Sequence, residues 1–312
     1  MASSSRLATP AQSKSLWIRI WSYRYIYLLL LPGFIWLLIF SYYPMYGVQL
    51  AFKSFRTSIA NSPWVGMANF NFMFRDVEFF IAFRNTVVIS AMKLAVNFPI
   101  PIILAMLLNE IHQQKFKKFL QTVFTFPHFL SWVIVAAIIQ NLLGSTGLVN
   151  NVIVSMGGER FMLFRNPQAF RWMLVISESW KGAGWSTIIY LAAIASIDPG
   201  QYESATIDGA NRFHRLLHVT WPGIRGIASM MFILAIGGLV GGNFDQIFNL
   251  YNPAVYSTAD ILPTYIYRVT FGTGNDFGVA TAIGLFNGLI NCVLLLIAHR
   301  VITKYTDRQL FV

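Results

Sequence analysis

A run of 28 uncharged residues stands near the start of the chain: YIYLLLLPGFIWLLIFSYYPMYGVQLAF, Tyr25–Phe52. About 20 apolar residues are enough for an α-helix to cross the hydrocarbon core of a bilayer. Lipid offers the backbone no hydrogen-bonding partners, and the run is too long for a strand of a membrane barrel. It therefore predicts a membrane-spanning helix.

The composition extends this interpretation to the whole chain. Of the 312 residues, 56% are hydrophobic and only 11% are charged, and the mean hydropathy is +0.56. A soluble domain carries about 25% charged residues, so the composition argues against a soluble enzyme and against a disordered chain. The sequence predicts an all-α membrane protein with six transmembrane helices. Besides Tyr25–Phe52, the predicted spans are Thr86–Asn109, Phe119–Leu143, Trp172–Ile197, Gly226–Phe244 and Phe277–Ala298.

The basic residues indicate the orientation in the membrane. The net charge is +11, and the positive-inside rule accounts for it better than binding to nucleic acid does. Thirteen of the 23 basic residues fall in four segments predicted to be cytosolic, and eight fall in the three predicted outer loops. Both termini are therefore predicted to be cytosolic. The predicted cytosolic segments are the tail 1–24, Ile111–Lys118, Asp198–Arg225 and His299–Val312, and the permease domain is predicted to span 25–303 with a tail at 304–312.

The loop between the fourth and fifth predicted spans carries the strongest local signals. Asp198 is an acidic N-cap, and Pro199 suits the first turn of the helix that follows. Gly209 permits a turn with positive φ. A second helix follows, in which Phe213 is at helical spacing from later apolar residues, and Pro222 is expected to end it.

The segment 198–222 resembles the EAA motif of the permease subunits of ABC importers, in the form typical of sugar permeases. Two residues depart from that motif, because Ser204 and Trp221 stand where Ala and Leu are usual. Matches elsewhere resemble oligosaccharide permeases of the Lpl type, at Leu31–Gly33, Tyr43–Pro44, Leu107–Glu110 and Tyr251–Tyr256. The residues that match the motif are Glu203, Ala205, Asp208, Gly209, Ala210, Phe213 and Pro222, which follows Gly209 by 13 positions.

The resemblance implies a type I ABC importer permease in the bacterial cytoplasmic membrane, with multiple spans. Its partners would be a second permease subunit, two ATPase subunits that bind ATP and Mg, and an extracytoplasmic solute-binding protein that delivers an oligosaccharide. The chain itself would hold no cofactor or metal, and it contains no GxxxxGK[ST] phosphate loop. The loop would form a coupling helix on an ATPase subunit, through Glu203, Ser204, Ala205, Asp208, Gly209, Ala210, Phe213 and Pro222.

Polar residues inside the predicted spans are costly, so each is a candidate for the substrate pathway. Glu178 and Lys181 are three residues apart on one helix and can neutralise each other. Lys93 either faces a cavity or extends to the membrane surface, and Lys93 and Lys181 favour an anionic saccharide such as a uronate. The predicted pathway residues are Trp180, Lys181, Trp185, Asn243, Asp245, Gln246, Asn287 and Asn291.

Three other functions remain open at this stage. Within the same class, the solute could be another polar compound, such as a glycerol phosphodiester. A secondary transporter would need no ATPase, and the EAA-like segment argues against it. A membrane enzyme is disfavoured, because no Ser-His-Asp or metal-ligand spacing is evident.

Overall fold

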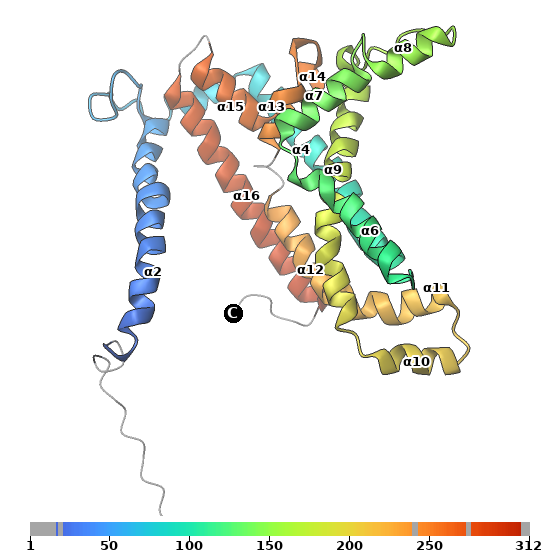
Figure 1. Ribbon diagram of the computed structural model, residues 1–312. Coiled ribbons are helices and arrows are strands. Elements are labelled where there is room, and N and C mark those ends of the chain that lie inside the picture. The colour runs from blue at the N-terminus through green and yellow to red at the C-terminus, as the bar shows by residue number, and fades with distance from the viewer. Residues whose placement is uncertain (1–16, 18–20, 239–242, 273–275, 307–312) are drawn as a thin grey trace, which may run out of the picture. The chain divides into compact units, whose positions relative to one another are not determined.

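The computed structural model describes residues 17, 21–238, 243–272 and 276–306, with side chains as far as residue 300. Every regular element in these ranges is a helix, and an isolated bridge pairs Lys53 with Trp64. The chain divides into two units, residues 1–49 and 50–312. Figure 1 shows the helices of each unit.

The first unit contains one long apolar helical stretch. The helix α2 (Arg24–Leu37) continues into the π-helical turn η1 (Leu38–Tyr42) and the 3₁₀ segment η2 (Tyr43–Phe52). The π turn lies just before Pro44, which has no N–H to donate, so the change of helix type accommodates the proline. No side chain of α2 or η1 is buried within the described chain.

The second unit is a bundle of helices arranged around α9 (Pro167–Ala195), which packs against α4, α5, α6 and α12. Asn166 caps α9 by accepting hydrogen bonds from two backbone N–H groups of its first turn. The other helices of this unit are α3 (Ala68–Met73), α4 (Val77–Asn97), α5 (Pro99–Asn109), α6 (Gln114–Thr125), η3 (Phe126–Phe129), α7 (Trp132–Leu143), α8 (Leu148–Ser155), η4 (Leu163–Arg165), α10 (Pro199–Ile207), α11 (Arg212–Arg215), η5 (Leu216–Thr220), α12 (Trp221–Gly237), α13 (Phe244–Leu250), η6 (Pro253–Val255), α14 (Tyr256–Ala259), α15 (Leu262–Phe271) and α16 (Phe277–Thr306).

Five helical stretches in the described chain are long and apolar enough to cross a membrane, which makes this a multi-pass membrane protein. The predicted span Trp172–Ile197 lies in α9 as far as Ala195, and α9 is 29 residues long but is not among the five. Its less apolar composition, with Glu178 and Lys181, distinguishes it from them. The five stretches are Arg24–Phe52, Val77–Asn109, Trp132–Ser155, Arg212–Gly237 and Phe277–Arg300.

The predicted span Phe119–Leu143 is wrong as a single helix. The helix α6 ends at Thr125, and α7 begins only at Trp132. Pro127 cannot donate a backbone hydrogen bond, and Ser131 then caps the new helix by accepting from the backbone N–H of Ile134. A long uncharged run therefore contains a turn that hydrophobicity alone does not reveal.

An ion-pair cluster fastens α15 to the start of α4. The guanidinium of Arg268 lies 2.6 Å from Asp260 and 2.8 Å from Glu78. Burial raises the pKa of Asp260, although the hydrogen bond from Thr264 and the charge of Arg268 oppose the change. Tyr265 donates to Asp76, the N-cap of α4, so two helices distant in sequence are joined at several points.

Candidate functional site

The loop predicted from the EAA-like residues forms two short helices at one end of the second unit (Figure 1). Asp198 caps α10 by accepting from the backbone N–H of Gly200 at 2.9 Å, and Pro199 occupies the first turn. Gly209 ends the helix at φ 78°, as predicted. Asn211 then caps α11 by accepting from the backbone N–H of His214 at 2.9 Å.

Two side-chain hydrogen bonds that the sequence did not predict hold this loop together. Arg215 of α11 donates to the hydroxyl of Thr206 of α10 at 2.9 Å. The hydroxyls of Tyr202 and Thr220 are 3.0 Å apart and join α10 to η5. The angle between the two short helices is therefore set by the chain itself.

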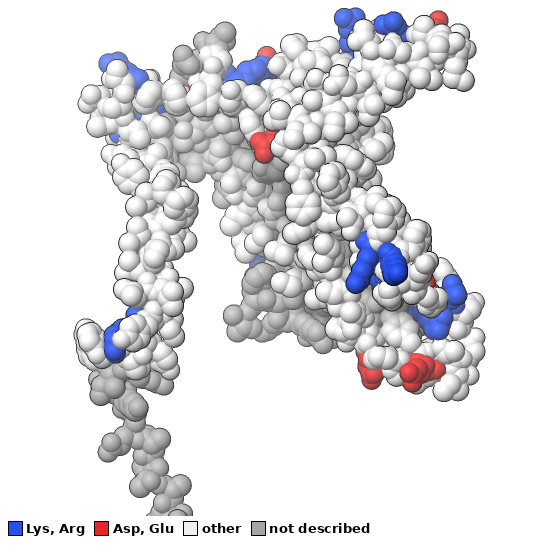
Figure 2. All heavy atoms as spheres, in the orientation of Figure 1, with Lys and Arg blue, Asp and Glu red and all other residues white. Residues whose placement is uncertain are grey.

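The loop exposes both apolar and charged side chains. Ile207, Phe213 and Leu217 are exposed by 86%, 70% and 50%. The carboxylates of Glu203 and Asp208 are exposed as well, while Ala205 and Ala210 are partly buried. Figure 2 shows acidic side chains over α10 and basic side chains over α11 and α6. Large exposed apolar side chains beside charged ones are a feature of interaction surfaces.

The expectation that Pro222 ends the second helix is wrong. The chain stays helical from α11 through the π turn η5 into α12, and Pro222 lies in the first turn of α12. In η5 the backbone N–H of Trp221 bonds to the carbonyl of Leu216, one residue further back than in an α-helix. The wider turn makes room for a proline, so the helix continues without a break.

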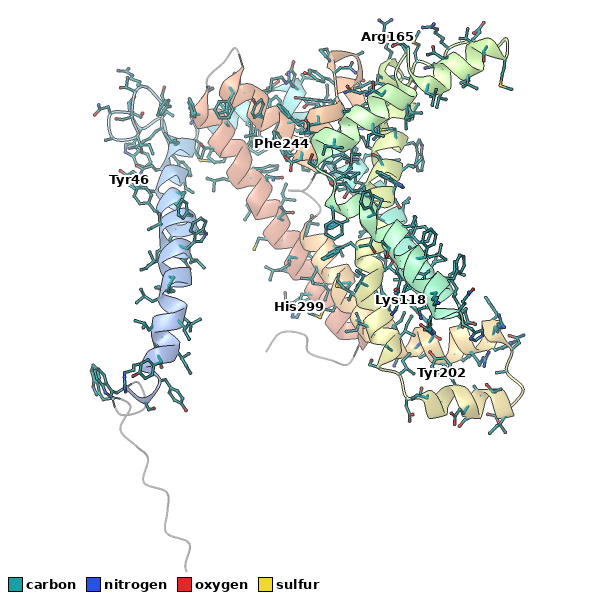
Figure 3. All side chains as sticks on the ribbon, in the orientation of Figure 1. Tyr46, Lys118, Arg165, Tyr202, Phe244 and His299 are labelled. Atoms are coloured by element: carbon teal, nitrogen blue, oxygen red, sulfur yellow. The ribbon has the colours of Figure 1, made fainter. Side chains whose placement is uncertain are left out.

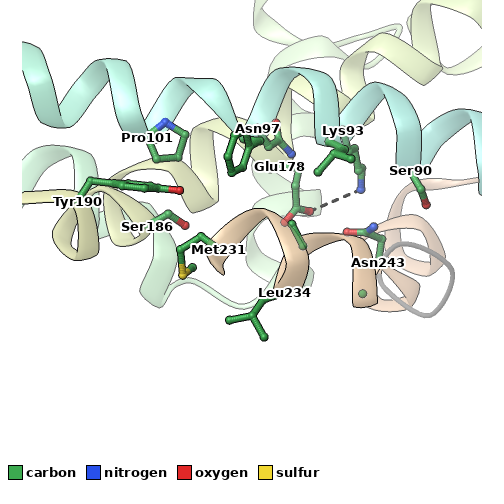
Figure 4. Close-up of a pocket in the computed structure, with 14 residues that line it drawn as sticks. Ser90, Lys93, Asn97, Pro101, Glu178, Ser186, Tyr190, Met231, Leu234 and Asn243 are labelled. Carbon is green, nitrogen blue, oxygen red and sulfur yellow. Dashed lines mark ion pairs between the residues drawn. The ribbon is translucent and has the colours of Figure 1, made fainter. Parts of the chain in front are cut away.

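A second feature is a polar cavity of about 330 Å³ between α4, α5, α9 and α12 (Figure 4). Lys93 and Glu178 face each other across it, with 3.6 Å between Nζ and Oε2. The side-chain oxygen Oδ1 of Asn97 is buried and accepts no hydrogen bond from any residue that the structure describes. The lining residues are Ser90, Lys93, Leu94, Asn97, Phe98, Pro101, Glu178, Ser186, Tyr190, Met231, Leu234, Ala235, Gly238 and Asn243.

Lys93 is held on two sides. Besides the ion pair with Glu178, its ammonium donates to the side chain of Gln246. Gln246 is fully buried and donates in turn to the carbonyl of Leu174 at 2.7 Å and to the hydroxyl of Ser177 at 2.9 Å. Of the two alternatives for Lys93, the cavity is the one observed, and the network joins α4, α9 and α13.

The predicted pair between Glu178 and Lys181 does not form in the described chain. Lys181 instead donates to the backbone carbonyl of His128 at 2.9 Å and lies over the ring of Trp132. That carbonyl belongs to the turn between α6 and α7, where helical hydrogen bonding is interrupted. The ammonium satisfies it, and Glu178 turns to Lys93 on the neighbouring helix.

The predicted pathway residues separate into several environments. Asn243 lines the cavity in a left-handed conformation with φ 77°, and Gln246 anchors Lys93. Trp185 stacks on the ring of His128, and Trp180 lines a separate apolar pocket against α7 and α8. Residues 239–242 of the predicted span Gly226–Phe244 lie outside the described residues. The remaining predicted residues lie elsewhere: Asp245 is exposed on α13, and Asn287 and Asn291 are partly exposed on α16.

Sequence reasoning missed Asn97, Ser186 and Tyr190 as cavity residues. Each is a polar side chain inside an otherwise apolar helix, which is the signal that could have identified them. The described residues contain no group of three or more His, Cys, Asp or Glu that could hold a metal ion. Asn97, Ser186 and Tyr190 add amide and hydroxyl groups to the cavity wall.

A multi-pass helical protein with a polar cavity between its helices and an exposed helix–turn–helix outside them has the architecture of a membrane transport subunit. Residues 97–306 match the family of binding-protein-dependent transport system inner membrane components. The chain belongs to this family, and it is a permease subunit rather than an enzyme.

Two curated relatives, both from Bacillus subtilis (strain 168), match over almost the whole chain. The polygalacturonan/rhamnogalacturonan transport system permease protein YteP is 39% identical, covering 96% of this chain and 94% of its own length. Protein LplB is 38% identical, covering 92% of this chain and 91% of its own length. The resemblance to sugar-type ABC permeases that the sequence indicated is confirmed.

The fold is also similar to solved structures. One is a bacterial ABC transporter involved in the import of the acidic polysaccharide alginate, with a TM-score of 0.86 and 38% identity over 93% of this chain and 99% of the other. Another is a bacterial alginate ABC transporter in complex with an alginate pentasaccharide-bound periplasmic protein. It has a TM-score of 0.86 and 38% identity, covering 94% of this chain and 98% of the other.

Proposed function

We propose that this permease subunit imports an acidic oligosaccharide, delivered by an extracytoplasmic solute-binding protein, across the bacterial cytoplasmic membrane. The observation that carries the proposal is the polar cavity around Lys93 and Asn97, in a chain whose relatives include permeases and transporters named for acidic polysaccharides. Sugars need several hydrogen-bonding groups in a pocket, and the cavity has amide, hydroxyl and charged ones. ATP and Mg belong to two partner ATPase subunits, and a second permease subunit completes the pathway.

The membrane domain, residues 25–303, contains six spans, with α9 as the one beyond the five most apolar stretches. A helix of 29 residues is about 44 Å long at 1.5 Å per residue, which is enough to cross a bilayer. Its charged side chains are compensated inside the protein, because Glu178 pairs with Lys93 and Lys181 binds a backbone carbonyl. Internal compensation is how ionisable groups are tolerated within a membrane.

With six spans, the tails 1–24 and 304–312 both lie in the cytosol. We expect single cysteines introduced at Ser5 and at Gln309 to be blocked from a membrane-impermeant maleimide in intact cells and to react after permeabilisation, because both tails carry basic residues. The exposed Cys292 is first replaced by Ser. A cysteine at Glu159, which is exposed in the predicted outer loop 144–171, should react from outside. Labelling of both tails in intact cells would contradict the six-span topology.

The segment 198–222 couples the permease to an ATPase subunit. Ile207 and Phe213 offer apolar side chains to a cleft on that partner, and Glu203 offers a carboxylate for an ion pair. The hydrogen bonds between Arg215 and Thr206 and between Tyr202 and Thr220 make the loop a unit that moves as one piece. Closure of the ATPase subunits on ATP would be transmitted through η5 into α12, which lines the cavity.

The translocation pathway passes through the cavity lined by Lys93, Asn97, Glu178 and Asn243. Asn97→Leu tests this, because its Oδ1 accepts no hydrogen bond from the described residues, so that its loss should cost little folding energy. We expect assembly to be retained and uptake of alginate oligosaccharides by the reconstituted transporter to fall by about tenfold, the effect of one lost hydrogen bond to a polar substrate.

Asn287→Leu is the matched control for that experiment. Its Oδ1 is also buried without a hydrogen bond to the described residues, but Asn287 lies on α16 and does not line the cavity. Uptake should therefore be much less affected than in Asn97→Leu. A larger loss in Asn287→Leu than in Asn97→Leu would move the pathway to α16, where the sequence also predicted it. Equal uptake of neutral arabino-oligosaccharides and alginate oligosaccharides would contradict the acidic substrate.

A further inference from the structure

A groove of about 700 Å³ lies between α6 and α9, close to the end of the unit that carries α10 and α11. The two helices are in direct contact next to it: a Cβ on Gly184 would lie 2.1 Å from the carbonyl oxygen of Phe124. Past this contact the facing surfaces separate, and the groove is open to the outside. Its lining residues are Asn109, Lys117, Gln121, Thr122, Thr125, Phe126, Phe129, Ile188, Leu191, Ala192 and Ala195.

The two walls of the groove have opposite chemistry. On α6, the lining side chains from Lys117 to Thr125 are polar, and they recur at helical spacing on one face. On α9, the lining side chains from Ile188 to Ala195 are apolar, also on one face. These walls are poor packing partners for each other, so a molecule with a polar side and an apolar side fits between them.

The polar end of the groove carries positive charge. Lys115, Lys117 and Lys118 stand within four residues at the start of α6, and none of them lies within 4 Å of a carboxylate in the described chain. Lys117 lines the groove, whereas Lys115 and Lys118 are exposed beside it. Figure 2 shows basic side chains gathered over this part of α6, and Figure 3 places Lys118 near the end of the molecule that carries Tyr202.

Along α6 and α9, the chemical groups that line the groove follow the same order as the parts of a phospholipid. Charge stands at Lys117, hydrogen-bond donors follow at Gln121 and Thr125, and exposed rings of Phe126 and Phe129 come last. We infer that the groove binds an anionic glycerophospholipid of the leaflet nearest the coupling loop. Its phosphate would lie at Lys117, its glycerol esters along the polar face of α6, and its acyl chains against α9. An occupant of the groove must face a cation at one end and an apolar wall along the other side. The phosphate and the acyl chains of a lipid do this, whereas a helix of a second protein would need a sequence that matches both.

The inference rests on the groove and not on the proposed substrate, and lipid retention tests it directly. The assembled transporter is reconstituted in nanodiscs of phosphatidylcholine and phosphatidylglycerol, released into detergent, and the retained lipids are counted by native mass spectrometry. We expect the wild type to retain phosphatidylglycerol in preference to phosphatidylcholine. Lys117→Gln should lower this preference about fivefold, the effect of one lysine near an anionic headgroup.

Lys115→Gln is the matched control, because it removes the same charge from the same helix outside the groove. It should leave most of the preference intact. Ala192→Trp fills the apolar wall without changing charge, and it should lower retention of both lipids. Equal loss of preference in Lys117→Gln and Lys115→Gln would show surface electrostatics alone and overturn the site. So would efficient cross-linking of a cysteine at Ala192 to the second permease subunit, since a protein would then fill the groove.

Discussion

Gly209→Val is expected to abolish substrate-stimulated ATP hydrolysis and uptake together, while the permease is still inserted and assembled. Gly209 has φ 78°, a conformation that is a strong outlier for a β-branched residue. Holding valine there costs about 1–3 kcal/mol, enough to reduce the population of the native turn by about 5- to 150-fold. The turn sets the relative positions of Ile207 and Phe213, so the surface offered to the ATPase subunit changes. The measurement is ATPase activity of the purified complex, with and without binding protein and alginate oligosaccharide.

Two control variants separate backbone strain from bulk. Asparagine tolerates the left-handed conformation, so Gly209→Asn should keep most of the stimulated activity. Apart from its chain neighbours, a Cβ at Gly209 meets no atom of the described residues within 4 Å, so a clash among them does not explain a defect. Gly226→Val makes the same substitution where a Cβ also meets nothing, and it should stay active. Full stimulation in Gly209→Val, with the ATPase still bound, would show that this loop is not the coupling element.

Local signals in the sequence predicted local structure well. The acidic cap at Asp198, the proline at 199 and the glycine turn at 209 each act within a few residues, and all three appear as predicted. Pro222 was misread because a proline normally ends a helix, and the π turn that accommodates it has no recognisable sequence pattern. The break at Pro127 was missed for the opposite reason, since hydrophobicity reports burial in lipid and not helix continuity.

Partners of polar side chains in the membrane were the least predictable feature. Glu178 and Lys181 are close on one helix, yet Glu178 pairs with Lys93, which is 85 positions away in the sequence. Which lysine pairs with Glu178 depends on the backbone carbonyl of His128, which accepts from Lys181, and on the position of Gln246. Both are results of tertiary packing. Sequence identified the costly residues correctly, but the fold decides which of them meet.

Glu178→Met is expected to be the most destabilising change in the cavity. It leaves the ammonium of Lys93 buried, with a relative exposure of 6% for its side chain, and with Gln246 as its remaining hydrogen-bonding partner. Removing one member of a fully buried ion pair costs about 3–5 kcal/mol, and the 29% exposure of the Glu178 side chain places this pair at or below the lower end of that range. We therefore expect a large drop in the apparent melting temperature of the purified complex and a lower yield of assembled transporter.

The double variant Lys93→Met/Glu178→Met should be more stable than Glu178→Met alone, because replacing both charges by apolar groups is often close to neutral. It does not return fully to the wild type, since Gln246 then lacks its lysine donor, at about 1–3 kcal/mol. Lys181→Met is the matched control: it removes a lysine that Glu178 does not contact, so its effect should simply add to that of Glu178→Met. The pairing within α9 would govern stability under either of two results. In one, the stability losses of Lys93→Met and Glu178→Met simply add in the double variant. In the other, Lys181→Met/Glu178→Met is more stable than Glu178→Met alone. The comparison thus distinguishes the pair across α4 and α9 from the pair that sequence spacing predicts.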